Sequence, residues 1–367
     1  MSKKLFITGG HLTPAIAVID EITEMKLPWE IVFVGRMHPF EGSYEISQEQ
    51  LTVETRHIRF ISLTTGRLQR MFTFQSIVSL AKVPYGFIQA FVLFFREKPD
   101  AVISFGGYIA LPIVVSGYFF GIPIITHEQT RRPGIANKII SYFAQKICLS
   151  FPDTTHTFPK EKTIVTGLPI RKNVLCVFKA VPITSKLSQF PLIYITGGST
   201  GSVSLNDLVF PLISSLAKKY TIIHQTGKAS FMKAKTILGE LPADDRKRYI
   251  TRDYIDESFI GWILHNASLV ISRSGANTVT ELSLLHKKAI LIPLPWSGGA
   301  EQLDNALWFT ENENGVVLDQ KKLTSTDLHA VISKIMSQSD IHKHTSIHTI
   351  VTDGAKQMVR LIQELLL

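Results

Sequence analysis

The apolar positions of this chain gather in short runs, and each run ends in a turn of glycine and other small residues. Such runs predict buried parallel strands, and the segments between them predict helices and loops. The strands predicted in the first half are Lys4–Thr8, Glu30–Gly35, Ala101–Phe105, Ile122–Thr126, Lys146–Leu149 and Thr163–Thr166. Those predicted in the second half are Leu192–Thr196, Thr221–His224, Leu269–Ser272, Ala289–Pro293 and Val316–Leu318. The alternation predicts an α/β fold with two doubly wound parallel sheets, ligands at the carboxyl ends of the strands, and a cleft between the halves.

Length and composition support this reading. The chain has 367 residues, more than a single core usually holds, so we expect two domains. Hydrophobic residues make up 45% and charged residues 19%, which argues against disorder and fits two buried sheets or a surface that touches a membrane. The net charge of +9 suits nucleic acid, anionic lipid or a phosphorylated substrate, and does not choose among them.

The sequence contains no sign of a disulfide framework or of secretion. Cys148 and Cys176 lie in no CxxC pattern or Cys/His cluster, so we expect no metal site and a reducing cytoplasm. The first residues lead into a strand rather than into the long apolar core of a signal peptide. The uncharged segment Ala101–Thr126 is long enough to span a membrane, but its glycines and prolines divide it into strand, loop, helix and strand.

The segment Val270–Glu281 carries the clearest chemical pattern. An apolar strand leads through Arg273-Ser274-Gly275 into a helix, and Gly275 lets backbone amides approach an anion at the helix start. Glu281, on that helix, can accept hydrogen bonds from the two hydroxyls of a ribose. The pattern predicts a nucleotide site, and an ordinary strand–turn–helix with a solvated glutamate is the alternative.

Three more glycine turns follow predicted strands, at Gly9-Gly10, at Gly106-Gly107-Tyr108 and at Gly197-Gly198-Ser199. Each can bring backbone amides close to a ligand. None has the pattern of a nicotinamide-binding or Walker A loop, so these cofactors are not expected. His11 follows the first turn directly and is the candidate general base, because histidine titrates near neutral pH. A capping or packing histidine is the alternative.

Polar residues follow two other predicted strands. His127-Glu128-Gln129 ends one strand and adds polar groups to the same sheet edge, with a hydrogen-bonded loop anchor as the alternative. Glu301, Gln302 and Asn305 follow a proline-rich turn, where amide side chains can recognise sugar hydroxyls. A plain helix start is the alternative there.

The segment Arg67–Arg96 is the candidate membrane surface because it mixes basic and apolar residues. We expect Arg67–Val83 to face lipid, with basic groups at anionic headgroups and apolar groups in the interface. Phe87, Phe91 and Phe95 recur at helical spacing, and we expect them on a buried helix against the first sheet. Pro84 would separate the two pieces.

Taken in order, the motifs of the whole chain resemble those of the MurG family of peptidoglycan glycosyltransferases. The motifs are Gly9-Gly10-His11-x-x-Pro14-Ala15, Phe105-Gly106-Gly107-Tyr108, His127-Glu128-Gln129, Pro133-Gly134, Thr166-Gly167-x-Pro169-x-Arg171, Gly197-Gly198-Ser199, His224-Gln225-Thr226-Gly227-Lys228 and Arg273-Ser274-Gly275. The resemblance implies a GT-B architecture of two Rossmann-like domains. It assigns residues 1–168 to the acceptor and the membrane and 172–349 to the UDP-sugar, with a last helix near 350–367 packed back on the first domain.

The resemblance also implies the reaction. It is an inverting transfer of N-acetylglucosamine from UDP-N-acetylglucosamine to the lipid-linked muramyl acceptor lipid I. The product is lipid II, and the enzyme works peripherally at the cytoplasmic face of the cell membrane, on an anionic surface. Neither a metal nor another cofactor is implied, and no nucleic-acid motif accompanies the basic charge.

Site residues carry over from the family by position. Glu281 would bind the ribose, Ile255 the uracil through its backbone, Ser199 the diphosphate and Gln302 the sugar. Gly275 belongs to the phosphate turn, Arg171 lies between the domains, and His11 is the catalytic candidate. The acceptor side comprises Gly9, Gly10, Gly106, Gly107, Tyr108, His127, Glu128 and Thr130.

The chain departs from the family at several of these positions. Its first glycine loop is shorter than the family's G-G-T-G-G-H, and Thr130, Thr200 and Glu301 replace other residues of the family patterns. Two alternatives to the lipid II reaction therefore stay open. One is a related GT-B transferase that glycosylates another lipid, such as diacylglycerol, and the other is a catalytically silent membrane-associated scaffold.

Overall fold

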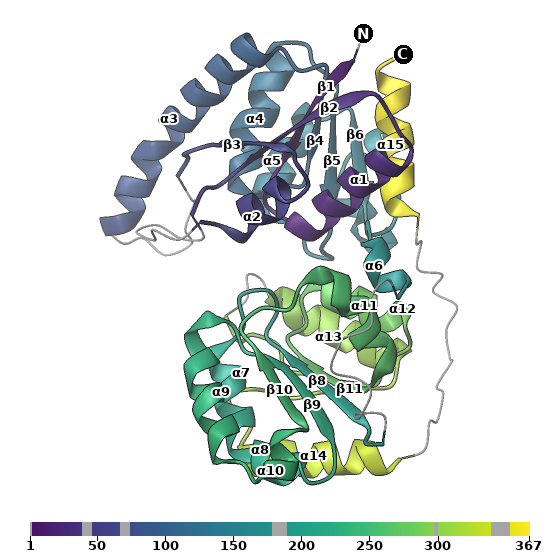
Figure 1. The fold of residues 1–367 in the computed structure, drawn as a ribbon. Helices are drawn as coiled ribbons and strands as arrows, with labels where there is room; N and C mark the ends of the chain where they lie inside the picture. The colour runs from purple at the N-terminus through teal and green to yellow at the C-terminus, as the bar shows by residue number, and fades with distance from the viewer. Residues whose placement is uncertain (1, 39–45, 67–73, 178–188, 297–299, 339–352) are drawn as a thin grey trace. The chain divides into compact units, whose positions relative to one another are not determined.

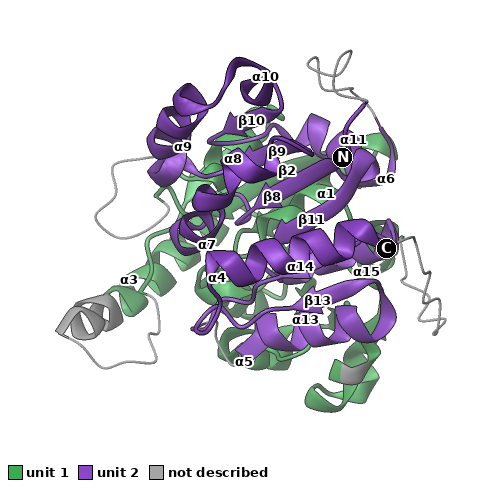
Figure 2. Ribbon diagram, turned by 90° about the horizontal axis from the view of Figure 1, so that it is seen from below, with its two compact units in different colours: residues 1–171, 351–367 green, residues 172–350 purple. Residues whose placement is uncertain are grey.

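The computed structural model describes residues 2–38, 46–66, 74–177, 189–296, 300–338 and 353–367, with the side chains of 74–81 and of residue 153 left aside. The chain forms two compact units. Unit 1 comprises Met1–Arg171 together with Val351–Leu367, and unit 2 comprises Lys172–Ile350 (Figure 2, green and purple).

Unit 1 is built on a seven-stranded sheet in the order β3-β2-β1-β4-β5-β6-β7, and every strand pair in it is parallel. The strands are β1 Lys3–Thr8, β2 Trp29–Gly35, β3 Arg59–Ser62, β4 Ala101–Ser104, β5 Ile124–Glu128, β6 Lys146–Leu149 and β7 Thr163–Val165. The helices are α1 Leu12–Glu24, α2 Gln48–Glu54, α3 Phe74–Glu97, α4 Gly107–Phe119, α5 Ile135–Phe143 and α15 Gly354–Leu365, with short 3-10 turns at Pro152–Thr157 and Lys160–Lys162.

Alternation along the strands of unit 1 fills a core on each face of the sheet. Leu5 and Ile7 point to one face, where they join a cluster that includes Ile16 of α1 and Met358 of α15. The intervening Phe6 points to the other face. There it meets the ring of Phe94, on α3, edge to face with 5.2 Å between centroids. The helices α1 and α15 pack side by side on the first face, although they come from opposite ends of the chain (Figure 1).

Unit 2 repeats this plan with a six-stranded sheet in the order β10-β9-β8-β11-β12-β13, again with parallel pairs. Its strands are β8 Leu192–Thr196, β9 Thr221–Gln225, β10 Tyr249–Arg252, β11 Ala267–Ser272, β12 Ala289–Leu291 and β13 Gly315–Val317. Its helices are α6 Lys172–Leu175, α7 Val203–Val209, α8 Ile213–Leu216, α9 Lys228–Glu240, α10 Ala243–Arg246, α11 Glu257–Asn266, α12 Ala276–Leu284, α13 Glu301–Asn312 and α14 Ser325–Ser337, with a 3-10 turn at Phe210–Leu212.

The predicted fold class of two doubly wound parallel sheets is confirmed. Two strands were missing from the prediction, and both are edge strands. Arg59–Ser62 and Tyr249–Arg252 are each four residues long and carry arginine, so they lack the apolar run that marks the buried central strands.

The predicted break at Pro84 is wrong, because α3 continues through it from Phe74 to Glu97. Between Lys82 and Glu97, the part of α3 whose side chains are described, the buried residues are Gly86, Ala90 and Phe94, one turn apart from each other. Phe91 and Phe95 lie one position beyond this stripe, about 100° around the helix, and are 51% and 71% exposed. The expectation that they are buried is therefore also wrong. The side chains from Arg67 to Ala81 in the predicted lipid-facing segment lie outside the described part of the structure.

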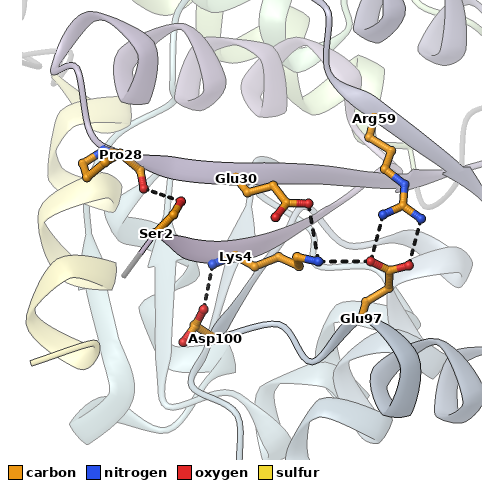
Figure 3. A network of polar contacts seen from close by, with 7 residues as sticks. All are labelled: Ser2, Lys4, Pro28, Glu30, Arg59, Glu97 and Asp100. Carbon is orange, nitrogen blue, oxygen red and sulfur yellow. Dashed lines mark hydrogen bonds and ion pairs between the residues drawn. The ribbon is translucent and has the colours of Figure 1, made fainter.

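An ion-pair cluster lies at the amino ends of β1, β2 and β3 in unit 1 (Figure 3). Arg59 donates two hydrogen bonds of 2.8 Å to the carboxylate of Glu97, at the end of α3. Lys4 donates to the same carboxylate through Nζ at 3.2 Å, and its backbone N–H donates to Asp100 at 2.7 Å. The cluster attaches the end of α3 to β1 and β3, at the sheet edge opposite the glycine turns.

None of the helices in the described ranges is long and apolar enough to cross a bilayer.

Candidate functional site

In unit 1, the turns after β1 and β4 touch each other at the carboxyl edge of the sheet. Gly10 has φ +130°, and a Cβ there would collide with the carbonyl oxygen of Gly106. Gly106 has φ +73° and lies against the side-chain amide of Asn137, from α5. Glycine is required at both positions because each combines a positive φ with close contact. The structure thus places Gly9, Gly10, Gly106 and Gly107 next to one another, and we call these four residues the glycine wall.

His11 lies at this wall, as the residue before α1. Its Nδ1 is 2.7 Å from Nε2 of Gln129, the residue after β5. Burial lowers the pKa of His11, the negative charge of Glu128 opposes this shift, and the positive charge of Arg36 adds to it. The imidazole is therefore neutral at physiological pH, which is the form that can take up a proton.

Glu128 and Thr130 belong to the framework behind this histidine. Both oxygens of the Glu128 carboxylate are in use. One accepts hydrogen bonds from the N–H and hydroxyl of Thr130, at 2.8 and 2.7 Å, and the other accepts from the amide of Asn137 at 2.8 Å. Glu128 is 2% exposed. These bonds fasten the loop after β5 to α5.

His127 is also an internal residue. Its Nε2 lies 3.2 Å from the hydroxyl of Ser150 and 3.4 Å from the carbonyl oxygen of Gly167. Burial lowers its pKa to about 3, so the ring stays neutral throughout the physiological range. Tyr108 lies in the first turn of α4 and is partly buried against the core.

Sequence reasoning missed one carboxylate beneath the first turn. Glu49, in the first turn of α2, is 6% exposed. Its two oxygens accept hydrogen bonds from the backbone N–H groups of Gly10, at 3.3 Å, and Arg36, at 3.2 Å. The shortened glycine loop is thus held from below by a side chain that is distant in the sequence. An acidic residue early in a helix is ordinary, so the sequence carried no signal for this contact.

Unit 2 has a similar pair of touching turns. Gly201, after β8, and Gly227, after β9, both have φ +75°, and a Cβ on either would collide with the carbonyl oxygen of Thr226 or of Thr200, respectively. Ser199 is exposed at the tip of the first turn. The amide of Gln225 donates to the carbonyl oxygen of Gly198 at 3.0 Å, which fixes the turn that presents Ser199.

A buried network supports the second of these turns. Asn206 donates to the carbonyl oxygen of Thr226 at 2.7 Å and contacts Nε2 of His224 at 3.0 Å, while Nδ1 of His224 lies 3.1 Å from the hydroxyl of Tyr249. Burial lowers the pKa of His224 to about 3, so this histidine is a neutral structural group.

Arg273 is a buried cation below the turn after β8. Its guanidinium donates to the hydroxyls of Ser202 and Ser204, at 2.7 and 2.8 Å, and to the carbonyl oxygen of Ile292 at 2.9 Å. Arg273 is 6% exposed, and burial lowers its pKa to about 10. Within the described residues no carboxylate lies at ion-pair distance from it, so the charge is held by neutral oxygens alone.

The remaining predicted donor residues are Gly275, Gln302, Glu281 and Ile255 in unit 2 and Arg171 in unit 1. Gly275 precedes α12, and a Cβ there would meet no atom within 4 Å, so the helix start is open. Gln302, on α13, accepts from the N–H of Leu294 at 2.9 Å, and its carbonyl oxygen accepts from Ser274 at 2.7 Å. Glu281 is a buried residue of α12. Ile255 is buried just before α11, and Arg171 is the last residue of the first stretch of unit 1.

No group of three or more His, Cys, Asp or Glu side chains able to hold a metal occurs in the parts of the chain described.

Comparisons with known proteins cover the whole chain. The glycosyltransferase family 28 N-terminal domain matches residues 8–149, and the C-terminal domain of the same family matches residues 192–361. A protein of Clostridium kluyveri is 31% identical over 373 residues and covers 99% of each chain. A protein of Clostridium botulinum, strain Loch Maree, is 31% identical with the same coverage. Both are named UDP-N-acetylglucosamine–N-acetylmuramyl-(pentapeptide) pyrophosphoryl-undecaprenol N-acetylglucosamine transferase.

Solved structures show the same fold. MurG of Acinetobacter baumannii superposes with a TM-score of 0.69 at 23% identity, over 99% of both chains. The UDP-N-acetylglucosamine 2-epimerase of Neisseria meningitidis, bound to its UDP-sugar, has a TM-score of 0.64 at 12% identity, over 99% of this chain and 100% of that one. At these identities the likeness concerns the fold alone.

Proposed function

The chain belongs to the MurG family of glycosyltransferases, within glycosyltransferase family 28, and we propose that it glycosylates lipid I. It is a hexosyltransferase that moves N-acetylglucosamine from UDP-N-acetylglucosamine to the lipid-linked muramyl-pentapeptide, and lipid II is the product. The observation that carries this conclusion is the match, at 31% identity over 99% of both chains, to transferases named for this reaction.

The chemistry is a single displacement at the anomeric carbon of the donor sugar. A hydroxyl oxygen of the muramyl acceptor forms the new bond to that carbon while the bond from the carbon to the UDP oxygen breaks, which inverts the configuration. The acceptor proton passes to His11, whose lowered pKa keeps it neutral and able to act as the base. UDP leaves with the bonding electrons, and its diphosphate has to be stabilised.

We assign that stabilisation to unit 2. The amides of the turn at Gly197–Gly201 and of the open start of α12 can face the diphosphate, and the buried charge of Arg273 lies below the first of these turns. Ser199, Ile255, Glu281 and Gln302 complete the donor site, with the roles that the family pattern gives them. The glycine wall of unit 1, with Tyr108, receives the acceptor, and Arg171 is the last residue before the chain enters unit 2.

We further propose that the enzyme binds the cytoplasmic face of the membrane peripherally, because its acceptor is anchored in lipid. The described residues of unit 1 include an exposed apolar face on α3 and α4, which pack together. Its members are Ile88, Phe91, Val92, Phe95, Tyr118 and Phe119, each 49–71% exposed. Arg96 adds positive charge to the exposed side of α3. Aromatic groups beside basic ones are suited to an anionic interface.

An acceptor competition assay tests the proposed reaction. Purified protein is given labelled UDP-N-acetylglucosamine together with equal amounts of lipid I and diacylglycerol. We expect label in lipid II and none above background in the glycolipid. Label that appears only in the diacylglycerol product would replace this proposal with the related transferase, and a protein that binds donor but labels neither lipid would be a scaffold.

A further inference from the structure

Gln129 is the side chain that contacts the imidazole of His11 directly. It follows β5, is 5% exposed, and has Nε2 2.7 Å from Nδ1 of the histidine. Its backbone is held firmly, since the carboxylate of the preceding Glu128 binds both Thr130 and Asn137. The other end of the Gln129 amide, Oε1, is buried and has no hydrogen-bond partner in the described structure.

Among the described residues, the imidazole of His11 is thus the hydrogen-bond partner of the Gln129 side chain. The oxygen and nitrogen of a glutamine amide exchange places by a half-turn about the last side-chain bond and differ little in size. If the nitrogen faces His11, it donates to Nδ1 and the histidine proton must sit on Nε2. If the oxygen faces His11, Nδ1 carries the proton and donates, and Nε2 keeps its lone pair.

His11 can act as a base through Nε2 only in the second arrangement, in which the amide oxygen of Gln129 faces Nδ1. Proton transfer from the acceptor hydroxyl needs a free lone pair on the ring nitrogen that is not engaged by Gln129. Once the proton has arrived, both ring nitrogens carry hydrogen, and an amide nitrogen facing Nδ1 would then be a donor against a donor. The amide oxygen can accept from Nδ1–H both before and after the transfer.

We propose that Gln129 is the positioning residue of His11: its amide oxygen accepts the Nδ1–H hydrogen bond and leaves Nε2 to take the acceptor proton. This inference rests on the proposed role of His11 as the base. An amide is neutral, so it orients the ring without adding negative charge. The charged and titratable groups that act on His11 are then Glu128, from β5, Arg36, after β2, and the neighbouring ring of His127.

The ring tautomer can be read directly, without any enzyme assay. In protein labelled with ¹⁵N at histidine, the imidazole nitrogen shifts distinguish the Nδ1–H form from the Nε2–H form, and the His11→Ala variant identifies the His11 signals. We expect the Nδ1–H form in the wild type above the pKa of His11. The Gln129→Leu variant, of similar shape but without an acceptor, should lose this preference. An Nε2–H form in the wild type would overturn the inference, whatever the protein transfers.

The pH profile of lipid I glycosylation gives the second readout. Gln129→Glu places a carboxylate against Nδ1, which favours the charged imidazole, so the acidic limb of the kcat profile should move up by about 1 pH unit or more. Gln129→Leu should lower kcat by about 10- to 100-fold, the effect that loss of the orienting partner has for metal-bound histidines, whose rings are held in the same way. KM for UDP-N-acetylglucosamine should stay the same, because no donor residue is changed.

Two controls separate this inference from its alternatives. In the His11→Ala background, Gln129→Leu should cause no further loss of kcat, because both changes remove the same function. An acidic limb that is the same in Gln129→Glu and the wild type would show that Gln129 is only structural. A wild-type protein that labels no lipid I would instead contradict the proposed reaction, and the tautomer measurement would still decide the role of Gln129.

Discussion

At the scale of single residues, unit 1 buries a neutral histidine at its candidate site, whereas unit 2 buries a charged arginine. Around His11 the polar groups are arranged so that the ring stays neutral, with burial outweighing the nearby carboxylate of Glu128. Around Arg273 a full positive charge is buried against serine hydroxyls and a carbonyl oxygen, without a carboxylate among the described residues. A buried charge without an opposite partner is unfavourable, so this site favours an incoming anion.

The first prediction concerns this charge. Arg273→Met should weaken UDP binding by about 10-fold or more, since it removes the buried positive charge and a hydrogen bond to a charged group contributes about 1.5–3 kcal/mol. Binding of uridine, which has no phosphate, should change much less. Calorimetry with both ligands measures the difference, and Lys247→Met, which removes an exposed charge from the same unit, is the control. Equal losses for UDP and uridine would mean that Arg273 only supports the fold.

The second prediction concerns the glycine wall. Gly10→Ala adds a methyl group where φ is +130° and the carbonyl oxygen of Gly106 is in the way, so we expect a loss of about 2 kcal/mol or more of unfolding free energy. Gly134→Ala makes the same change in the same unit at φ −68°, with no atom within 4 Å, and should cost clearly less, about 0.5 kcal/mol, because alanine is a poorer N-cap for α5 than glycine. Urea unfolding of both variants checks this, and equal stabilities would refute the described contact.

At the scale of elements, the short apolar runs that end in glycine turns were sufficient to predict most strands of both sheets. The central strands could be recognised because they are buried on both faces, as β4 and β5 are throughout. The edge strands β3 and β10 lacked that signal. In α3, the phenylalanine spacing correctly indicated a helix, but periodicity alone does not say which stripe packs inward. The small buried residues Gly86 and Ala90 mark the inward stripe, and at Gly86 the helix lies so close to Thr65 that a Cβ would collide with it.

A third prediction follows from the outward face of α3. The double variant Phe91→Ser, Phe95→Ser should reduce flotation with anionic liposomes, since both rings are more than half exposed and each adds apolar area at the interface. Met232→Ser removes an exposed apolar side chain from unit 2 and should float like the wild type. UDP binding should be intact in both. Undiminished flotation of the double variant would exclude this face as the membrane contact.

At the scale of the whole molecule, the fold could be predicted further than the site. Parallel strands all end at the same edge of a sheet. The sequence was therefore sufficient to predict that the glycine turns lie at the carboxyl edge of each sheet. The contacts that give the site its chemistry join residues far apart in the sequence, such as Glu49 with Gly10 and Gln129 with His11. Nothing in the local sequence of α2 or β5 specifies these partners, so only the three-dimensional structure reveals them.

The fourth prediction concerns the ion-pair cluster at the amino ends of β1, β2 and β3. Hydrogen bonds from Arg59 and Lys4 lower the pKa of Glu97. A lowered folded-state pKa stabilises the protein above the unfolded-state pKa, about 4.3, and this stabilisation is lost as the pH falls through the folded-state value. Glu97→Gln should therefore cost about 1 kcal/mol at pH 7 and progressively less in acid.

Thermal or urea unfolding between pH 3 and 7 measures this dependence. The exposed Glu54, whose carboxylate accepts a hydrogen bond from the neutral amide of Gln50 in the same helix, provides the matched control through Glu54→Gln. A Glu97→Gln cost that does not vary with pH would show that the carboxylate charge is not what stabilises the cluster.

The central claim is that this protein transfers N-acetylglucosamine to lipid I with His11 as the base. The most direct measurement is the rate of lipid II formation from labelled UDP-N-acetylglucosamine by the wild type and by His11→Ala, beside calorimetric binding of UDP to each. We predict that the wild type forms lipid II and that the variant loses about 10²–10⁴-fold in kcat, the usual contribution of a positioned base, while it binds UDP as tightly. Lipid II formation at the wild-type rate by His11→Ala, or none by the wild type, would contradict the account.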